Sequence, residues 1–133
     1  MNRKLLGSVL GLPMVAAIVL AGGSPASASG GGGKIETGNC SAASDWELKV
    51  KKDNGKLEVE YEVDSNQAGQ TWAVLITDNG NQVFAGDKVT KPRSGSFTAR
   101  ARTANLAGND TFVATAENAA SGETCTGTLV FKR

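Results

Sequence analysis

Apolar and charged residues alternate strictly in two neighbouring segments of the chain, residues 46–50 and 57–63. A period of two places successive side chains on opposite faces of a β-strand, so each segment is predicted to be a strand with one buried face. The connection, residues 53–56, has Asn-Gly at its centre and favours a type I′ hairpin turn, because both central residues need positive φ. This turn predicts the facing pairs Val50–Val59, Leu48–Tyr61 and Trp46–Val63 on the buried face, and Lys51–Glu58 and Lys49–Glu60 on the outer face.

Turn residues punctuate the rest of the chain in the same way. A second Asn-Gly turn, at residues 78–81, pairs residues whose numbers sum to 159, so Leu75 is predicted to face Phe84. Alternating or β-branched segments between turns predict five further strands, at residues 71–77, 82–89, 97–102, 111–116 and 124–131. Seven short strands at regular spacing predict an antiparallel β-sandwich.

These strands resemble those of immunoglobulin-like and fibronectin type III-like domains. The resemblance covers residues 40–131 and rests on strand number, strand order and Trp72 on the third strand. It implies that strands one, two and five form one sheet and strands three, four, six and seven the other. The chain is also similar to small secreted actinobacterial proteins of unassigned function, in the hairpin 46–63, in Gly69-Gln70-Thr71-Trp72 and in Gly122-Glu123-Thr124-Cys125-Thr126-Gly127.

The first residues have the pattern of an export signal. Arg3 and Lys4 precede an apolar run at residues 5–21, and Ala26-Ser27-Ala28 offers small residues for cleavage. A membrane anchor is the alternative, but a run of 17 residues interrupted by glycine and proline is marginal for that purpose. We therefore predict a helical signal peptide at residues 1–28, a Gly-rich flexible leader at 29–39 and an all-β, seven-stranded antiparallel Ig-like β-sandwich domain at 40–133. The mature chain is expected to be secreted and to have no membrane association.

Composition removes several kinds of chemistry. The chain has no histidine, which excludes histidine-dependent catalytic triads and histidine-ligated zinc. Its formal net charge is +1, and the loss of Arg3 and Lys4 would leave twelve basic against thirteen acidic residues, so no nucleic-acid partner is indicated. The two cysteines, Cys40 and Cys125, are expected to form a structural disulfide in an oxidising compartment.

Phase along the strands suggests one binding surface. If Trp72, Val74 and Ile76 point into the core, then Leu75 and its predicted partner Phe84 point outward. The same alternation turns two residues of neighbouring strands outward and completes an apolar patch, which often marks an interaction site. The candidate binding residues are Leu75, Phe84, Val113 and Val130. A bulge in the second hairpin is the alternative, and it would turn Phe84 inward.

The loop at residues 91–95 suggests a second candidate function. An exposed loop containing Pro92, Arg93 and Ser94 resembles a substrate of a trypsin-like protease, and small secreted β proteins serve as protease inhibitors. An ordinary solvated loop is the simpler interpretation, because no cysteine flanks the loop to make it rigid.

The remaining polar and aromatic features have structural explanations. The charged residues of three strands interleave in sign and predict cross-strand ion pairs: Lys49, Lys51, Glu58, Glu60, Glu62, Arg100 and Arg102. Trp46, Tyr61 and Trp72 are in phase with core positions rather than forming a platform for sugars. The oxygen-rich clusters at 53–55, 78–81 and 109–110 are typical of turns, so no metal or other cofactor is predicted.

We therefore expect a secreted, non-enzymatic binding module, a monomer or weak homodimer, whose partner is a protein or a cell-surface component. The protease inhibitor with its loop at Arg93 is the alternative function. A hydrolase is a distant third, because it would need two acidic residues that converge in a cleft.

Overall fold

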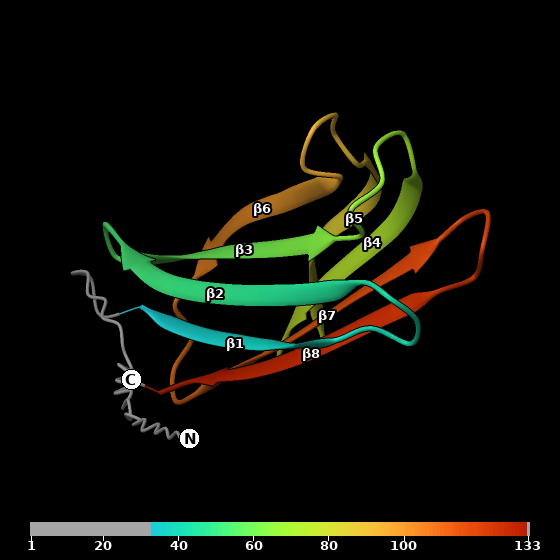
Figure 1. The fold of residues 1–133 in the computed structure, drawn as a ribbon. Coiled ribbons are helices and arrows are strands. Elements are labelled where there is room, and N and C mark those ends of the chain that lie inside the picture. Colours follow the sequence, from blue (N-terminus) through green and yellow to red (C-terminus); the bar gives the residue numbers. More distant parts are fainter. Residues whose placement is uncertain (1–32, 133) are drawn as a thin grey trace, which may run out of the picture.

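The computed structural model describes residues 33–132, which form two four-stranded antiparallel β-sheets (Figure 1). The first sheet has the order β1-β2-β3-β6 and contains β1 (Lys34–Asn39), β2 (Asp45–Asp53), β3 (Lys56–Asp64) and β6 (Ser96–Ala104). The second has the order β5-β4-β7-β8 and contains β4 (Thr71–Asp78), β5 (Asn81–Val89), β7 (Asp110–Asn118) and β8 (Thr124–Phe131). No helix suited to crossing a membrane occurs in residues 33–132. The predicted signal peptide at 1–28 lies outside the described residues.

The hairpin of β2 and β3 confirms the predicted register. All five predicted pairs are present, from Trp46 opposite Val63 to Lys51 opposite Glu58. The turn residues Asn54 and Gly55 have φ values of 52° and 80°, as a type I′ turn requires. Local alternation and turn chemistry therefore fix this hairpin together.

The seven expected strands are divided between the two sheets as predicted, but an eighth strand is added. Residues 34–39, which we expected in the flexible leader, form β1 and pair with β2 from Lys34–Val50 to Asn39–Asp45. The prediction for this segment was wrong, and the sandwich begins before Cys40. The physical reason is that this segment pairs with β2 along its whole length and also contacts β8 of the other sheet.

The hairpin of β4 and β5 departs from the predicted register. Near the turn, Asp78 faces Asn81 and Thr77 faces Gln82, as expected, but the register then shifts between Ile76 and Thr77. Beyond this bulge Phe84 faces Ile76 and Ala85 faces Leu75, so the predicted Leu75–Phe84 pair was wrong. Val83 and Phe84 are adjacent apolar residues, and the bulge lets both side chains pack against the core.

The core lies between the two sheets and is built from their inward-facing residues. Its largest fully buried side chains include Trp72, Tyr61, Phe97 and Phe112. The rings of Trp72 and Phe97, which belong to opposite sheets, lie 6.2 Å apart between centroids. Tyr61 and Trp72 are therefore buried in the core as predicted, whereas Trp46 is only partly buried and packs against it.

At one edge of the sandwich β1 and β2 contact β8 (Figure 1). Trp46 of β2 fills this edge. Its indole lies over two glycines, Gly38 of β1 and Gly127 of β8, and an ideal Cβ at either glycine would lie 2.6 Å from a ring carbon. The Tyr61 hydroxyl nearby donates a hydrogen bond of 3.1 Å to the Cys125 carbonyl. Glycine is therefore required at these two positions by the close approach of the ring.

The Cys40–Cys125 disulfide is formed as predicted, with an S–S distance of 2.04 Å. It joins the turn between β1 and β2 to the start of β8. Two hydrogen bonds beside it, from Ser41 N to Thr124 O and from Thr124 N to Ser41 Oγ, fix the same junction. The bridge therefore fastens the first sheet to the second.

Replacing Cys125 with serine should lower the free energy of unfolding by about 2–5 kcal/mol, because the bridge restricts the unfolded chain over a sequence separation of 85 residues. Urea denaturation of Cys125→Ser and of the wild-type protein, each with and without reductant, measures this change. Reduction should destabilise the wild-type protein by a similar amount and leave the variant unchanged. An unaltered midpoint in the variant would contradict a stabilising role.

Gly127→Ala should destabilise the fold by about 1–3 kcal/mol, because the added methyl group would overlap the Trp46 ring. Gly86→Ala is a matched control within a strand, since its Cβ would have its nearest neighbour at 3.8 Å, in the Phe84 ring. Thermal unfolding of both variants gives the comparison. Equal melting temperatures would show that the ring moves aside without cost.

Candidate functional site

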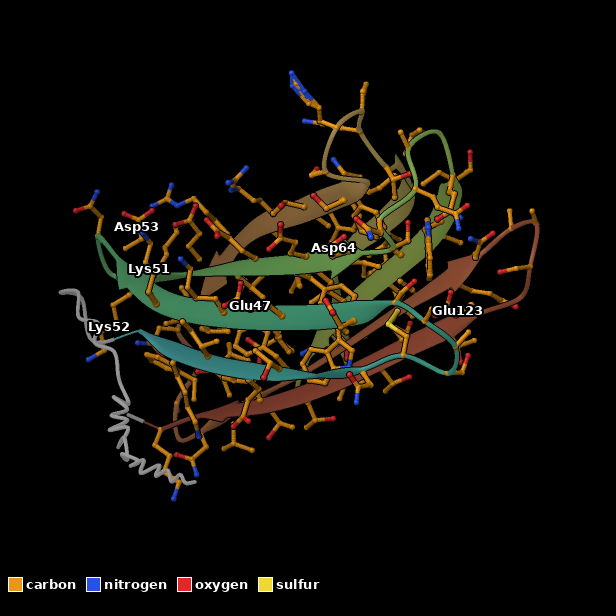
Figure 2. All side chains as sticks on the ribbon, viewed as in Figure 1. Glu47, Lys51, Lys52, Asp53, Asp64 and Glu123 are labelled. Carbon is orange, nitrogen blue, oxygen red and sulfur yellow. A yellow bond between two sulfur atoms is a disulfide. The ribbon has the colours of Figure 1, made fainter. Side chains whose placement is uncertain are left out.

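The outer faces of the two sheets have opposite chemistry. On the first sheet, the outward positions of β2, β3 and β6 are mostly lysine, glutamate and arginine (Figure 2). On the second sheet, the outward positions of β4, β7 and β8 are mostly threonine, alanine, valine and leucine. Two sheets that share one core therefore present one charged and one nearly uncharged surface.

The charged face is internally neutralised at the end near the β2–β3 turn. Glu60 lies 3.7 Å from Lys49 and 3.0 Å from Arg100, measured between nitrogen and oxygen atoms. Lys51 pairs with Glu58 at 3.5 Å, and Arg102 with Asp53 at 3.1 Å. The predicted cross-strand ion pairs are confirmed for all the predicted residues except Glu62, which is in none of them. Such a network leaves little net charge for a partner.

At its other end the same face is acidic. The register places Glu47 directly opposite Glu62 and Asp45 directly opposite Asp64. In Figure 2, Glu47 and Asp64 lie away from the end of the sheet that carries Lys51 and Asp53. None of the ion pairs within residues 33–132 includes these four carboxylates. Partial burial and then the neighbouring carboxylates raise the pKa of Glu62. Apart from these four carboxylates, nothing in the described residues at this acidic end points to a ligand.

On the nearly uncharged face, three of the four predicted binding residues point outward. Leu75 is 41% exposed, and Val113 and Val130 are partly buried. Leu75 faces Thr115, two positions from Val113, and Val113 faces Thr128, two positions from Val130. The three residues therefore form a diagonal apolar stripe across β4, β7 and β8, beside an open hollow lined in part by Leu75, Thr115 and Thr126.

Phe84 does not belong to this stripe. The bulge turns its ring toward the interior, where it is partly buried and packs against the core cluster. The outward position opposite Leu75 is taken by Ala85. The four-residue patch is therefore reduced to three residues, and the small side chain at Ala85 leaves Leu75 more accessible.

The loop at residues 91–95 is firmly held and exposes Arg93. Lys91 N donates to Ser96 O, and Gly95 N donates to Lys91 O, so the base of the loop is closed. Gly95 is buried, and a Cβ there would collide with the backbone of Asn66 and Gln67. Arg93 itself has a φ of 83°, in the left-handed region. The arginine is therefore presented on a tight turn and not on an extended segment.

The sequence did not reveal a pair of carboxylates that the fold brings together. Asp78 ends β4 and Asp110 begins β7, and the two side chains are 1% and 0% exposed. Burial, with the adjacent charge of Asp110 adding to it, raises the pKa of Asp78 to about 7. The oxygen-rich clusters at 78–81 and 109–110 thus meet, joined by Asn79 Nδ2 to Asn109 O at 3.1 Å. Only the pairing of β4 with β7 creates this contact.

Comparisons of the chain with models of protein families, with curated protein sequences and with solved structures found no match. Its surfaces and buried groups are therefore the basis for any functional assignment.

Replacing Glu62 with glutamine should raise the free energy of unfolding at neutral pH by about 0.2–1 kcal/mol, because it removes repulsion from Glu47 and its acidic neighbours. A carboxyl whose pKa is raised in the folded state stabilises the fold in acid and loses that contribution as pH rises through the folded pKa. The gain should therefore be present at pH 7 and absent near pH 3 in urea denaturation. Glu58→Gln, which breaks the pair with Lys51, is the control and should show no gain.

Proposed function

We propose that this chain is a secreted, non-enzymatic binding module with an Ig-like sandwich fold, and that it engages its partner through the outer face of the second sheet. One observation carries the proposal: this face is nearly uncharged and holds an exposed leucine, Leu75, near its centre. Leu75 does not belong to the hydrophobic core cluster. A partner that covers it would remove apolar surface from water.

The composition of the face supports recognition of a macromolecule. Thr115 and Thr126 face each other on β7 and β8, beside the apolar stripe. Their hydroxyl groups donate and accept hydrogen bonds without the large desolvation cost of charged groups. An apolar centre with a mainly polar rim is typical of protein–protein interfaces. The disulfide is the feature that favours an extracellular, oxidising compartment.

We also propose that the chain has no enzyme activity. The chain contains no histidine, and the carboxylates that converge, Asp78 and Asp110, are shielded from substrate by burial. A hydrolase of the paired-carboxylate kind needs an accessible cleft between its two acids.

The alternative, protease inhibition through Pro92, Arg93 and Ser94, is less well supported. Proteins that bind peptides along a strand edge require an extended backbone in the bound segment. Arg93 has a φ of 83°, which reverses the chain direction at the residue that would enter the protease. The binding-module function is therefore preferred.

Leu75→Glu should reduce capture of the partner by about tenfold or more, because burying a leucine contributes about 1.5–3 kcal/mol. The immobilised protein would be incubated with culture-medium and cell-wall fractions, and the retained species quantified by mass spectrometry. Ile35→Glu is the matched control, since Ile35 is 51% exposed but lies on β1 of the other sheet.

Both variants should keep the wild-type melting temperature, which confirms that the substitutions act at the surface. Equal capture by Leu75→Glu and the wild-type protein would overturn the assignment of this face. Equal losses in the two variants would mean that the interaction depends on exposed apolar groups in general.

A further inference from the structure

Asp78 and Asp110 lie at one end of the second sheet, on its inward face. Asp78 is directly opposite Phe112, and Asp110 is two residues before Phe112 on the same face of β7. Asp110 is also directly opposite Phe131 of β8. The two carboxylates are therefore diagonal neighbours between aromatic core residues, in surroundings that provide little compensation for negative charge.

The backbone around the pair is held in place by Asn79. The backbone nitrogen of Asn79 donates to Thr111 O at 2.9 Å, and Thr111 N donates to Asn79 Oδ1 at 2.8 Å. These hydrogen bonds join Asn79 to Thr111 and do not involve the carboxylates of Asp78 and Asp110. The position of the pair is thus fixed by contacts in which the carboxylates take no part.

All four carboxylate oxygens of the pair are buried and have no hydrogen-bond partner. No lysine or arginine of the described chain forms an ion pair with either residue. Asn105, five residues before Asp110 in the loop that leads into β7, has a buried Oδ1 that is likewise unpartnered. Buried acceptors without donors are rare, because each costs free energy.

Two compensations are chemically possible, a shared proton or a cation. One proton forms one O–H···O bond between the carboxyl groups and leaves the two remaining carboxylate oxygens unsatisfied. A divalent cation neutralises both charges and accepts every oxygen as a ligand. The set contains only oxygen donors, which calcium prefers and which zinc and copper do not.

We propose that Asp78 and Asp110 form a calcium site at this end of the sandwich, with Asn105 contributing a further oxygen. The two carboxylates supply the charge, and backbone carbonyl oxygens or water complete the six to eight ligands that calcium takes. The ion would link the end of β4 to the loop that enters β7. The site is independent of the proposed binding face, since its side chains point to the other side of the sheet.

Calcium binding to the purified full-length protein, first treated with EDTA and dialysed, would be measured by isothermal titration calorimetry. We expect one calcium ion per chain and a rise in melting temperature of roughly 5 °C at saturation. Asp78→Asn and Asp110→Asn should each weaken binding by on the order of tenfold or more. Asp53→Asn is the matched control, because Asp53 lies at the other oxygen-rich Asn-Gly turn and is paired with Arg102.

Hydrogen exchange on the wild-type protein provides a readout that does not depend on folding of the variants. Calcium should slow exchange of the amides at 78–80 and 105–112 and leave the β2–β3 turn unchanged. Unaltered affinity in the Asp78 and Asp110 variants, or protection elsewhere, would overturn the proposal. Absence of calcium binding would also overturn it and would assign the pair a shared proton, and equal affinity for magnesium would contradict the choice of calcium.

Discussion

The packing of Trp46 between β1 and β8 is the constraint on which the rest of the molecule depends. The register of the β2–β3 hairpin follows from its own sequence. Strand β8, however, comes from the far end of the chain and must align with β1 and β2 at one particular offset along the strand direction. At the observed offset Gly38 and Gly127 both lie against the indole, where a Cβ at either position would overlap the ring. The disulfide and the Tyr61 hydrogen bond then hold β8 at that offset.

Glu123 extends this junction to the loop between β7 and β8. Its carboxylate accepts hydrogen bonds from Ala42 N, Ser44 N and Ser44 Oγ, and Figure 2 shows it beside the disulfide. The turn between β1 and β2 is thereby fastened to the second sheet by covalent and polar contacts. With β8 fixed, alternation decides which side chains of the second sheet face outward, so the proposed binding face depends on the same junction.

The two Asn-Gly hairpins explain how much of the fold was predictable. In the first, every second residue is charged, so a one-residue slip would bury charge, and the Asn54-Gly55 turn fixes the pairing that remains. All five predicted pairs were correct. In the second, Val83 and Phe84 are adjacent apolar residues, and strict alternation would expose one of them. The turn formed as predicted, but the bulge removed this conflict and changed the partner of Leu75.

Features created by long-range pairing were beyond prediction. The segment 34–39 forms a strand through its contacts with β2 and β8, which its own sequence does not reveal. Asp78 and Asp110 each had an adequate explanation as turn residues, and only the pairing of β4 with β7 made them neighbours. The candidate binding face was anticipated for Leu75, Val113 and Val130, whose phase follows from alternation alone.

The difference in charge between the two outer faces also indicates what kind of partner the molecule can bind. Covering the first sheet would require desolvation of ion pairs such as Arg100–Glu60, which already satisfy each other in water. Covering the second requires desolvation of threonine hydroxyls, whose cost is recovered when the partner supplies hydrogen-bonding groups. The proposed partner therefore matches an apolar contact at Leu75 with uncharged polar groups opposite Thr115 and Thr126. A strongly charged partner would gain little from this face, because its outward charges are confined to Asp87 and Glu117, on either side of Ala73.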